Sequence, residues 1–310
     1  MKKNTKVLVV GGTGFLGYHF CKKILKKKWI ITSISTNLPR RIRRLNKIKY
    51  LICDIRKKNQ IKKLNKNFDY VINFGGYVDH TRKKKTYQSH FNGCKNLADH
   101  FLNTKIKSFI QIGSCVEYGF LKSPQRPNYK TSINNLKSVY GIAKLKASNY
   151  IINLNRKFDF PSTVLRLYLV YGPKQDINRF IPIIINGCLK NLNFDTSDGK
   201  QSRDFLYVTD LVDVIIKILK NKKTRGKIFN VGSGSPKKLK KIIKFIQKKI
   251  KSGKPNFGKL ELRKDEILNL YPDIKKTKTI LKWKPRVNLK DGLYKTINYY
   301  KRLYNYVSKS

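Results

Sequence analysis

Long hydrophobic runs are missing from this sequence. No stretch approaches the ~20 apolar residues that a helix needs to cross a bilayer. Near the start, only four consecutive apolar residues, Val7 to Val10, precede a glycine turn, which is too few for the apolar region of a signal peptide. We therefore expect a protein that has no membrane span, is not exported and resides in the cytoplasm.

Cysteines are few, and their spacing suggests no pairing. Their number is odd, and none of them forms a CxxC motif or a spacing typical of a metal site. This pattern argues against a disulfide framework and for reduced thiols in a cytosolic protein with no metal centre. The five residues are Cys21, Cys53, Cys94, Cys115 and Cys188.

Acidic residues are also scarce: 17 Asp and Glu stand against 70 Lys and Arg, for a formal net charge of +53. Such an excess usually suggests nucleic acid or an acidic surface as a partner. Here the basic residues are spread along the whole chain, which indicates a composition bias and solvated side chains. We therefore expect no nucleic-acid partner, although a positive field would concentrate anionic substrates.

Short apolar runs of β type alternate with helical patterns through the first half of the chain. This alternation predicts an α/β fold with a doubly wound parallel sheet and helices on both faces. We expect strands at 6–10, 29–35, 49–53, 70–74, 108–112 and 163–170, and helices near 15–27, 87–103 and 138–155. Ligands of such sheets bind beyond the carboxyl ends of the strands.

A glycine-rich turn follows the first expected strand. Gly11, Gly14 and Gly17 have a GxxGxxG spacing between this strand and the first expected helix. Glycines let the backbone turn tightly and approach a pyrophosphate, and the helix N-terminus supplies free N–H donors. The motif predicts a Rossmann-type dinucleotide site. We therefore assign residues 1–170 to an NAD(P)-binding domain and 171–310 to a smaller, partly interleaved C-terminal substrate lobe with a soft boundary.

The second expected strand ends near Ser35 without the acidic residue that usually binds the ribose 2′-hydroxyl of NAD. Arg40 and Arg41 follow, and an arginine can accommodate the 2′-phosphate of NADP. In so basic a chain, the missing acid says more than the arginines. NAD and NADP both remain open, and the missing acid favours NADP.

Three residues form a candidate catalytic group. Tyr140 and Lys144 are four positions apart, on one face of an expected helix. A neighbouring ammonium favours the phenolate form of a tyrosine, so the pair could move a proton, although the spacing could also be chance in a chain rich in both residues. Ser114 follows the 108–112 strand and could hydrogen-bond the substrate oxygen whose proton Tyr140 moves.

Taken together, the motifs resemble the NAD-dependent epimerase/dehydratase family, the extended short-chain dehydrogenases/reductases, almost from end to end. The resembling segments are 11–17, 53–55, 73–76, 90–97, 113–119, 140–144, 165–173, 203–211, 229–234 and 271–293. The family acts on nucleotide sugars, and its members commonly dimerise through a helix pair. The resemblance therefore implies a nucleotide-sugar substrate and a homodimer.

The resemblance also implies a role for each site residue. Tyr140 would be the acid/base, Lys144 would lower its pKa and bind the nicotinamide ribose, and Ser114 would polarise the substrate oxygen. Arg203 and Arg263 would bind the substrate diphosphate, a task that suits forked guanidinium donors. The residues expected to line the cofactor, besides Tyr140 and Lys144, are Gly11, Gly14, Phe15, Leu16, Gly17, Asp54 and Ile55.

One departure from the family pattern narrows the chemistry. The family's 4,6-dehydratases carry an Asp-Glu pair directly after the Ser/Thr, where this chain has Cys115 and Val116. Eliminating water needs an acid and a base, so the missing pair disfavours dehydration. Glu117 is one position too far along the chain to replace them.

The expected reaction is hydride transfer at the sugar ring, at C4, by an epimerase or by an NADPH-dependent 4-ketoreductase. Two alternatives from other classes remain. A non-catalytic nucleotide-binding regulator could use the same fold. A polyanion-binding protein, which rests on charge alone, would bind nucleic acid with a steep dependence on salt.

Overall fold

Seven parallel strands form the central sheet of the computed structural model, which describes residues 4–262 and 266–307. Their order is β11-β6-β5-β4-β1-β2-β3. The sheet confirms the predicted α/β, doubly wound fold. Its strands are β1 (Lys6–Val10), β2 (Ile30–Ser35), β3 (Lys49–Ile52), β4 (Tyr70–Asn73), β5 (Ser108–Ser114), β6 (Ser162–Leu167) and β11 (Lys227–Val231).

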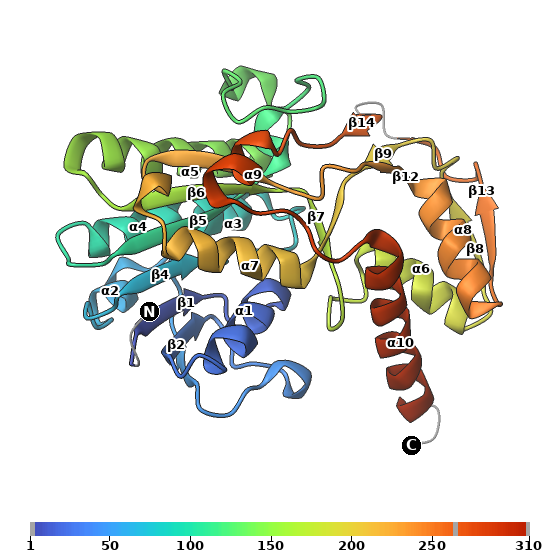
Figure 1. Ribbon diagram of the computed structural model, residues 1–310, viewed down its shortest axis with the longest axis horizontal. Coiled ribbons are helices and arrows are strands. Elements are labelled where there is room, and N and C mark those ends of the chain that lie inside the picture. Colours follow the sequence, from blue (N-terminus) through green and yellow to red (C-terminus); the bar gives the residue numbers. More distant parts are fainter. Residues whose placement is uncertain (1–3, 263–265, 308–310) are drawn as a thin grey trace.

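Helices cover both faces of this sheet (Figure 1). The pattern starts in β1, where Val7 and Val9 face one apolar core and Leu8 and Val10 face the other, as the period of two in a strand requires. The first core is closed by α1 (Phe15–Leu25) and α7 (Val208–Leu219). The second is closed by α2 (Lys58–Lys62), α4 (Gly93–Phe101) and α5 (Val139–Phe158).

The strand order reverses between β1 and β4. From β1 the chain builds outward through β2 and β3, and then returns to place β4, β5 and β6 on the other side of β1. Loops that leave the carboxyl ends of β1 and β4 therefore diverge, and a crevice opens between them. The glycine-rich turn lies at this reversal.

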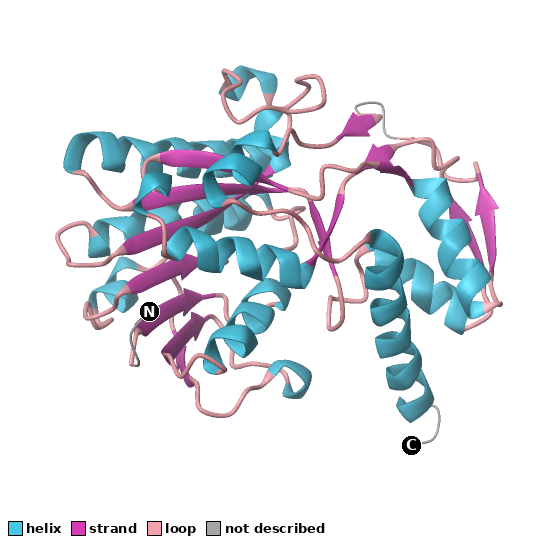
Figure 2. Cartoon of the chain, viewed as in Figure 1, coloured by secondary structure: helices cyan, strands magenta, loops and turns pink. Residues whose placement is uncertain are grey.

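The rest of the chain encloses a third apolar core, at the right of Figures 1 and 2. It lies between α6 (Phe180–Leu189), α8 (Leu239–Ile250) and α10 (Leu289–Val307), which bury residues such as Ile185, Ile246 and Leu293. Two small sheets border it: β8 (Asn193–Thr196) pairs with β13 (Lys254–Phe257), and β12 (Lys237–Lys238) and β14 (Asn269–Leu270) flank β9 (Ser202–Arg203).

The prediction of one strand over 163–170 was wrong. The chain follows β11 as β6 and then changes partner at Tyr168, whose N–H still donates to the Val231 oxygen. The next residues form β7 (Leu169–Tyr171), which pairs with β10 (Phe205–Tyr207). The apolar run in the sequence does not reveal this change of partner. The change depends on which distant segment is placed to form the next hydrogen bonds.

Segments beyond residue 170 return to the first sheet. Helix α7 lies on one face, β11 forms an edge, and α9 (Lys275–Leu281) packs beside them through Leu281. The division of the domains at residue 170 stays a prediction.

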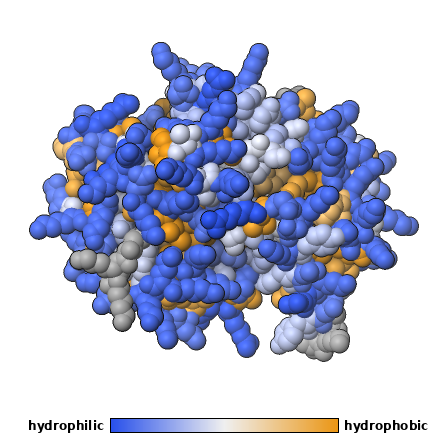
Figure 3. Space-filling view, in the orientation of Figure 1, coloured by the Kyte–Doolittle hydropathy of each residue, from blue (hydrophilic) through white to orange (hydrophobic). Residues whose placement is uncertain are grey.

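The face shown in Figure 3 is mostly hydrophilic, with scattered apolar side chains. Among the described residues, no helix has the length and apolar character that a membrane crossing requires. All five cysteines are buried and unpaired.

Candidate active site

A cleft of about 720 Å³ opens at the carboxyl ends of the central strands. It lies where the strand order reverses, the place where open α/β sheets bind ligands. The cleft brings together the predicted residues Gly11, Gly14, Phe15, Leu16, Gly17, Asp54, Ile55, Ser114, Tyr140 and Lys144.

The glycine-rich turn is packed so tightly that side chains are excluded. A Cβ at Gly17 would lie 2.3 Å from the Gly11 carbonyl oxygen, and a Cβ at Gly11 would lie 3.2 Å from the backbone of Phe74. Gly11 also has a φ of +75°, a conformation that favours glycine. Helix α1 therefore begins directly against the turn, and the unpaired N–H groups of its first turn suit an anion such as a pyrophosphate.

Asp54, which follows β3, is bound to its own neighbour. Its carboxylate accepts hydrogen bonds from Nε and Nη2 of Arg56, and these bonds lower the pKa of Asp54. It also accepts the Arg56 backbone N–H at 3.0 Å and so caps the turn after the strand. Its contact with a cofactor stays a prediction.

Ser114, Tyr140 and Lys144 meet at the floor of the cleft. Ser114 ends β5, and Tyr140 lies in the first turn of α5, where Ser138 accepts the Gly141 N–H at 3.0 Å as an N-cap. Lys144 is 4% exposed, donates to the Ile112 oxygen at 2.7 Å and has its Nζ 5.8 Å from the centre of the Tyr140 ring. Residues that are distant in sequence thus form one polar group.

Burial shapes the acid/base properties of this group. It raises the pKa of Tyr140 to about 12, and a hydrogen bond with Ser114 opposes this rise. Burial also lowers the pKa of Lys144 to about 8. Burial alone therefore favours the neutral phenol of Tyr140, the form that donates a proton, whereas accepting a proton requires its phenolate. Whether Lys144 lowers the pKa of Tyr140, as the resemblance implies, stays a prediction.

Two histidines that the sequence analysis did not select flank Tyr140. The His80 ring is stacked on the Tyr140 ring at 3.9 Å, and the His90 ring meets it edge-on at 4.9 Å. Nε2 of His90 lies 3.1 Å from the Tyr77 oxygen, and a Cβ at Gly76 would lie 1.9 Å from His90 Cε1. The loop after β4 is thus fitted around His90. The available signal was weak: both histidines lie in or near segments that carry the family resemblance.

A sequence model described as the NAD dependent epimerase/dehydratase family matches residues 7–232. The chain belongs to this family. The match confirms the resemblance that the motifs indicated.

Relatives within the family differ in the reaction that their names state. A putative UDP-glucose 4-epimerase of Methanocaldococcus jannaschii is 30% identical over 95% of this chain and 98% of its own. A UDP-N-acetyl-alpha-D-glucosaminuronate decarboxylase of Bacillus cytotoxicus is 26% identical over 98% of this chain and 100% of its own. The structure of a UDP-glucuronic acid 4-epimerase from Bacillus cereus, in complex with UDP-glucuronic acid and NAD, matches 97% of this chain and 100% of that chain, with a TM-score of 0.86 and 25% identity.

Arg203 and Arg263, which were predicted to bind the substrate diphosphate, are not seen in the cleft of this epimerase/dehydratase family member. Arg203 is not among the residues that line the cleft; it pairs with Glu266 and donates from Nη1 to the Ser202 oxygen. It is near enough to Cys115 to oppose the burial that raises the pKa of this thiol to about 12. Arg263 lies outside the described residues. Both roles stay predictions.

A different arginine lines the cleft. Arg179, just before α6, lies in the lining and tends to lower the pKa values of Tyr140 and His80. Asp176, also in the lining, accepts a hydrogen bond from the buried Arg43 at 2.8 Å. This pair joins the segment after β2 to the loop before α6 and so fixes one rim of the cleft.

Glu117 points away from the cleft, into a buried ion pair. Its Oε1 accepts the Ser114 N–H at 2.7 Å, and its Oε2 accepts from Nε of Arg166 at 2.7 Å. Glu117 is not among the residues that line the cleft. It is thus committed to holding the end of β5, which agrees with the expectation that it does not replace the missing dehydratase carboxylates.

Two histidines, the buried His90 and the half-buried His19, predict that the protein loses stability in weak acid. Burial lowers the pKa of His90 from 6.5 to about 2 and that of His19 from 6.5 to about 4. Below pH ~6.5 the unfolded chain binds these protons and the folded protein does not, so the free energy of unfolding falls as the pH falls. Each histidine should contribute up to about 1.4 kcal/mol per pH unit. Urea unfolding from about pH 7 to about pH 5 measures this slope.

The variant His90→Asn should flatten the slope, because it removes one proton that only the unfolded chain binds. His100→Asn is the matched control: burial also lowers the pKa of the half-buried His100, but less than that of His90, so this variant should flatten the slope less. An equal slope for wild type and His90→Asn would contradict a neutral, buried His90.

Proposed function

We propose that the chain is an NAD(P)-dependent nucleotide-sugar epimerase that transfers hydride at C4 of the sugar ring, with Tyr140 as acid/base. The observation that carries this proposal is the meeting of Ser114, Tyr140 and Lys144 in one cleft with the glycine-rich turn. The family, and 4-epimerases among the relatives, support the choice of substrate class.

The cleft suits a dinucleotide. The turn at Gly11 and Gly17 has no room for side chains, and the N-terminus of α1 offers donors for a pyrophosphate. When bound, the cofactor would supply the nicotinamide ring as a reversible hydride acceptor. The residues that would hold the cofactor are those of the turn, Asp54 and Ile55 after β3, and Lys144 on the nicotinamide side.

The protein's own residues would handle the proton. Tyr140 would take the proton of the sugar hydroxyl while hydride leaves the same carbon, and would return it on reduction. The Ser114 hydroxyl would orient this oxygen by a hydrogen bond. Lys144, held by the Ile112 oxygen, would supply the positive charge that favours the Tyr140 phenolate.

The choice between epimerase and 4-ketoreductase is part of the proposal. An epimerase must let the keto sugar present its other face and must keep its cofactor, whereas a ketoreductase delivers hydride once and exchanges NADPH. The 4-epimerases among the relatives favour the first, and a decarboxylase among them shows that the family's reactions vary. A non-catalytic regulator would not need Ser114, Tyr140 and Lys144 to converge.

The preference for NADP also stays a prediction. Ser35 and Thr36 line the cleft where the 2′-position is expected, and no acid follows β2. Arg40 and Arg41, the arginines expected near a 2′-phosphate, are exposed and are not among the residues that line the cleft. The expectation thus rests on the missing acid alone.

The location and the oligomeric state are also part of the proposal. The unpaired cysteines support a cytoplasmic location, and the homodimer rests on the resemblance.

The test is to denature the purified protein, identify any released nucleotide by mass spectrometry, and titrate the emptied protein with NADH and NADPH. Incubation with UDP-glucose and with UDP-glucuronic acid, with the products followed by NMR, then tests the reaction. Retained NAD and an inverted C4 would support the epimerase. An empty site with a preference for NADPH would support the ketoreductase, and failure to bind either nucleotide would overturn both.

A further inference from the structure

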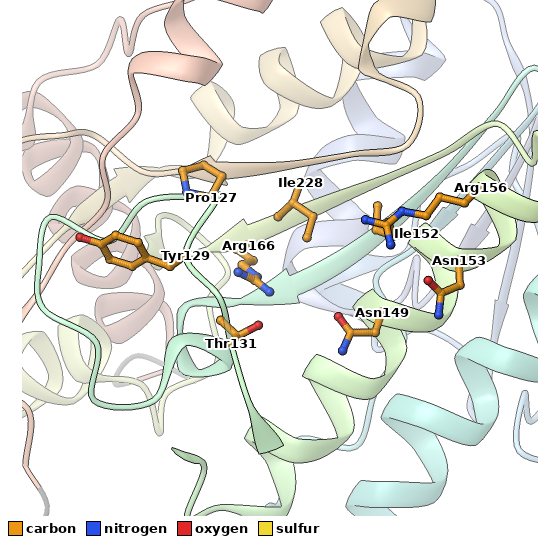
Figure 4. A pocket seen from close by; sticks show the side chains of 9 residues that line it. All are labelled: Pro127, Tyr129, Thr131, Asn149, Ile152, Asn153, Arg156, Arg166 and Ile228. Carbon is orange, nitrogen blue, oxygen red and sulfur yellow. The ribbon is translucent and has the colours of Figure 1, made fainter. Parts of the chain in front are cut away.

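A second pocket, of about 370 Å³, lies between α5, β6 and the loop that contains Pro127 (Figure 4). The loop around Pro127 and Tyr129 forms one wall, α5 forms another through Asn149 and Asn153, and Arg166 of β6 lies between them. None of its lining residues lines the cleft. The volume is at the lower end of the range found for small-molecule sites.

Arg166 is the residue that gives this pocket its chemistry. It is 1% exposed, and its Nε donates to Glu117. Its Nη1 is buried and has no hydrogen-bond partner among the described residues. A buried charged donor without an acceptor is costly, so an acceptor placed in the pocket would be stabilised.

The charge and shape of the lining define the class of ligand. Two arginines and no acid contribute to it, the second arginine being Arg156 of α5. Because Glu117 balances the charge of Arg166, one positive charge remains, which matches a monoanion. A planar guanidinium pairs best with a carboxylate or phosphate, and of these the carboxylate is the monoanion. Ile152, Ile228 and Pro127 add apolar surface beside the arginines.

We propose that this pocket binds a small organic carboxylate, with its carboxylate group on Arg166 and Arg156 and its apolar body against Ile152 and Ile228. The site is joined to the cleft by one ion pair: Glu117 accepts from Arg166 with one oxygen and from the Ser114 N–H with the other. A carboxylate on Arg166 shares its guanidinium with Glu117 and weakens that pair. Occupancy should therefore alter turnover through Ser114, and this coupling rests on the proposed function.

The experiment uses the full chain and 4-fluorobenzoate, with its binding followed by fluorine NMR. Wild type should bind this probe and should bind uncharged 4-fluorobenzyl alcohol more weakly. Arg156→Gln should weaken binding by about tenfold or more, because it removes a charged hydrogen bond. Lys157→Gln removes the same charge from the next, exposed position of α5 and should leave binding unchanged. Asn149→Phe, which fills the pocket and keeps its charge, should abolish binding.

Equal binding to the Arg156→Gln and Lys157→Gln variants would show that the net charge of the chain attracts the probe, and would overturn the site. No binding to wild type at millimolar probe, or equal binding of the alcohol, would also overturn it. The coupling is tested by turnover: the probe should change the kcat of wild type but not that of Arg156→Gln. Binding with unchanged kcat would overturn the coupling alone, whereas a wild type without turnover would contradict the proposed function and leave the binding result valid.

Discussion

Replacing Tyr140 by phenylalanine is expected to lower turnover by about 10²- to 10⁴-fold, the usual contribution of a positioned general acid/base. Phenylalanine keeps the ring between His80 and His90 and removes only the hydroxyl that would exchange a proton with the sugar. Because the glycine-rich turn and Lys144 are untouched, the affinity for the nicotinamide cofactor should change little.

The measurement combines kcat and KM with the epimerised sugar and a cofactor titration of the same protein. Tyr150→Phe is the matched control: it removes a hydroxyl from the same helix, where Tyr150 donates to Asp99 away from the cleft. The two variants should unfold at similar temperatures. A Tyr140→Phe variant with near-normal kcat would refute the assigned role, and a variant that lost cofactor as well would point to a positioning role.

The sheet and the glycine-rich turn could be predicted from the sequence because both follow from local rules. In β1, four apolar residues in succession mark a strand buried on both faces, and Val9 and Val10 do reach opposite cores. Gly11 and Gly17 are needed because backbone atoms a few residues away leave no room for a Cβ. Patterns of this kind involve residues close together in sequence, so they can be recognised without knowing the rest of the fold.

Features that depend on distant partners were not predictable in the same way. The break at Tyr168 occurs because the chain changes hydrogen-bond partners between segments far apart in sequence. His80 and His90 become candidate site residues only because α5 places the Tyr140 ring between them. Arg179 enters the cleft, while Arg203 pairs with Glu266, and nothing in the spacing of basic residues separates the two.

Glu117 is a further residue whose partner could not be predicted from the sequence. Its position in sequence predicted that it does not replace the missing dehydratase carboxylates, but could not reveal its partner, which lies 49 residues away on β6. The pair is almost fully buried, with side chains 0% and 2% exposed. Burial opposes the charge on Arg166, while Glu117 and Tyr118 raise the pKa of the guanidinium above its ordinary value.

Glu117→Gln is therefore expected to lower the free energy of unfolding by about 3–5 kcal/mol, because it leaves Arg166 charged and buried without its counter-ion. Glutamine keeps the size of the side chain and can still accept the Ser114 N–H, so the loss should report the missing charge. Urea unfolding at neutral pH measures it. Asp213→Asn, which breaks an exposed ion pair with Lys23 (3.9 Å), should cost at most about 1 kcal/mol.

The double variant Glu117→Gln/Arg166→Met separates the cost of an unpaired charge from the value of the pair itself. Methionine removes the stranded guanidinium and fills part of its volume, so the double variant should regain stability relative to Glu117→Gln. A double variant less stable than Glu117→Gln would show that Arg166 stabilises the fold through other contacts, such as the Tyr118 ring 4.3 Å from its guanidinium carbon. A Glu117→Gln variant that lost no more than Asp213→Asn would contradict the expected cost, and would mean that solvent or an anion in the second pocket already compensates Arg166.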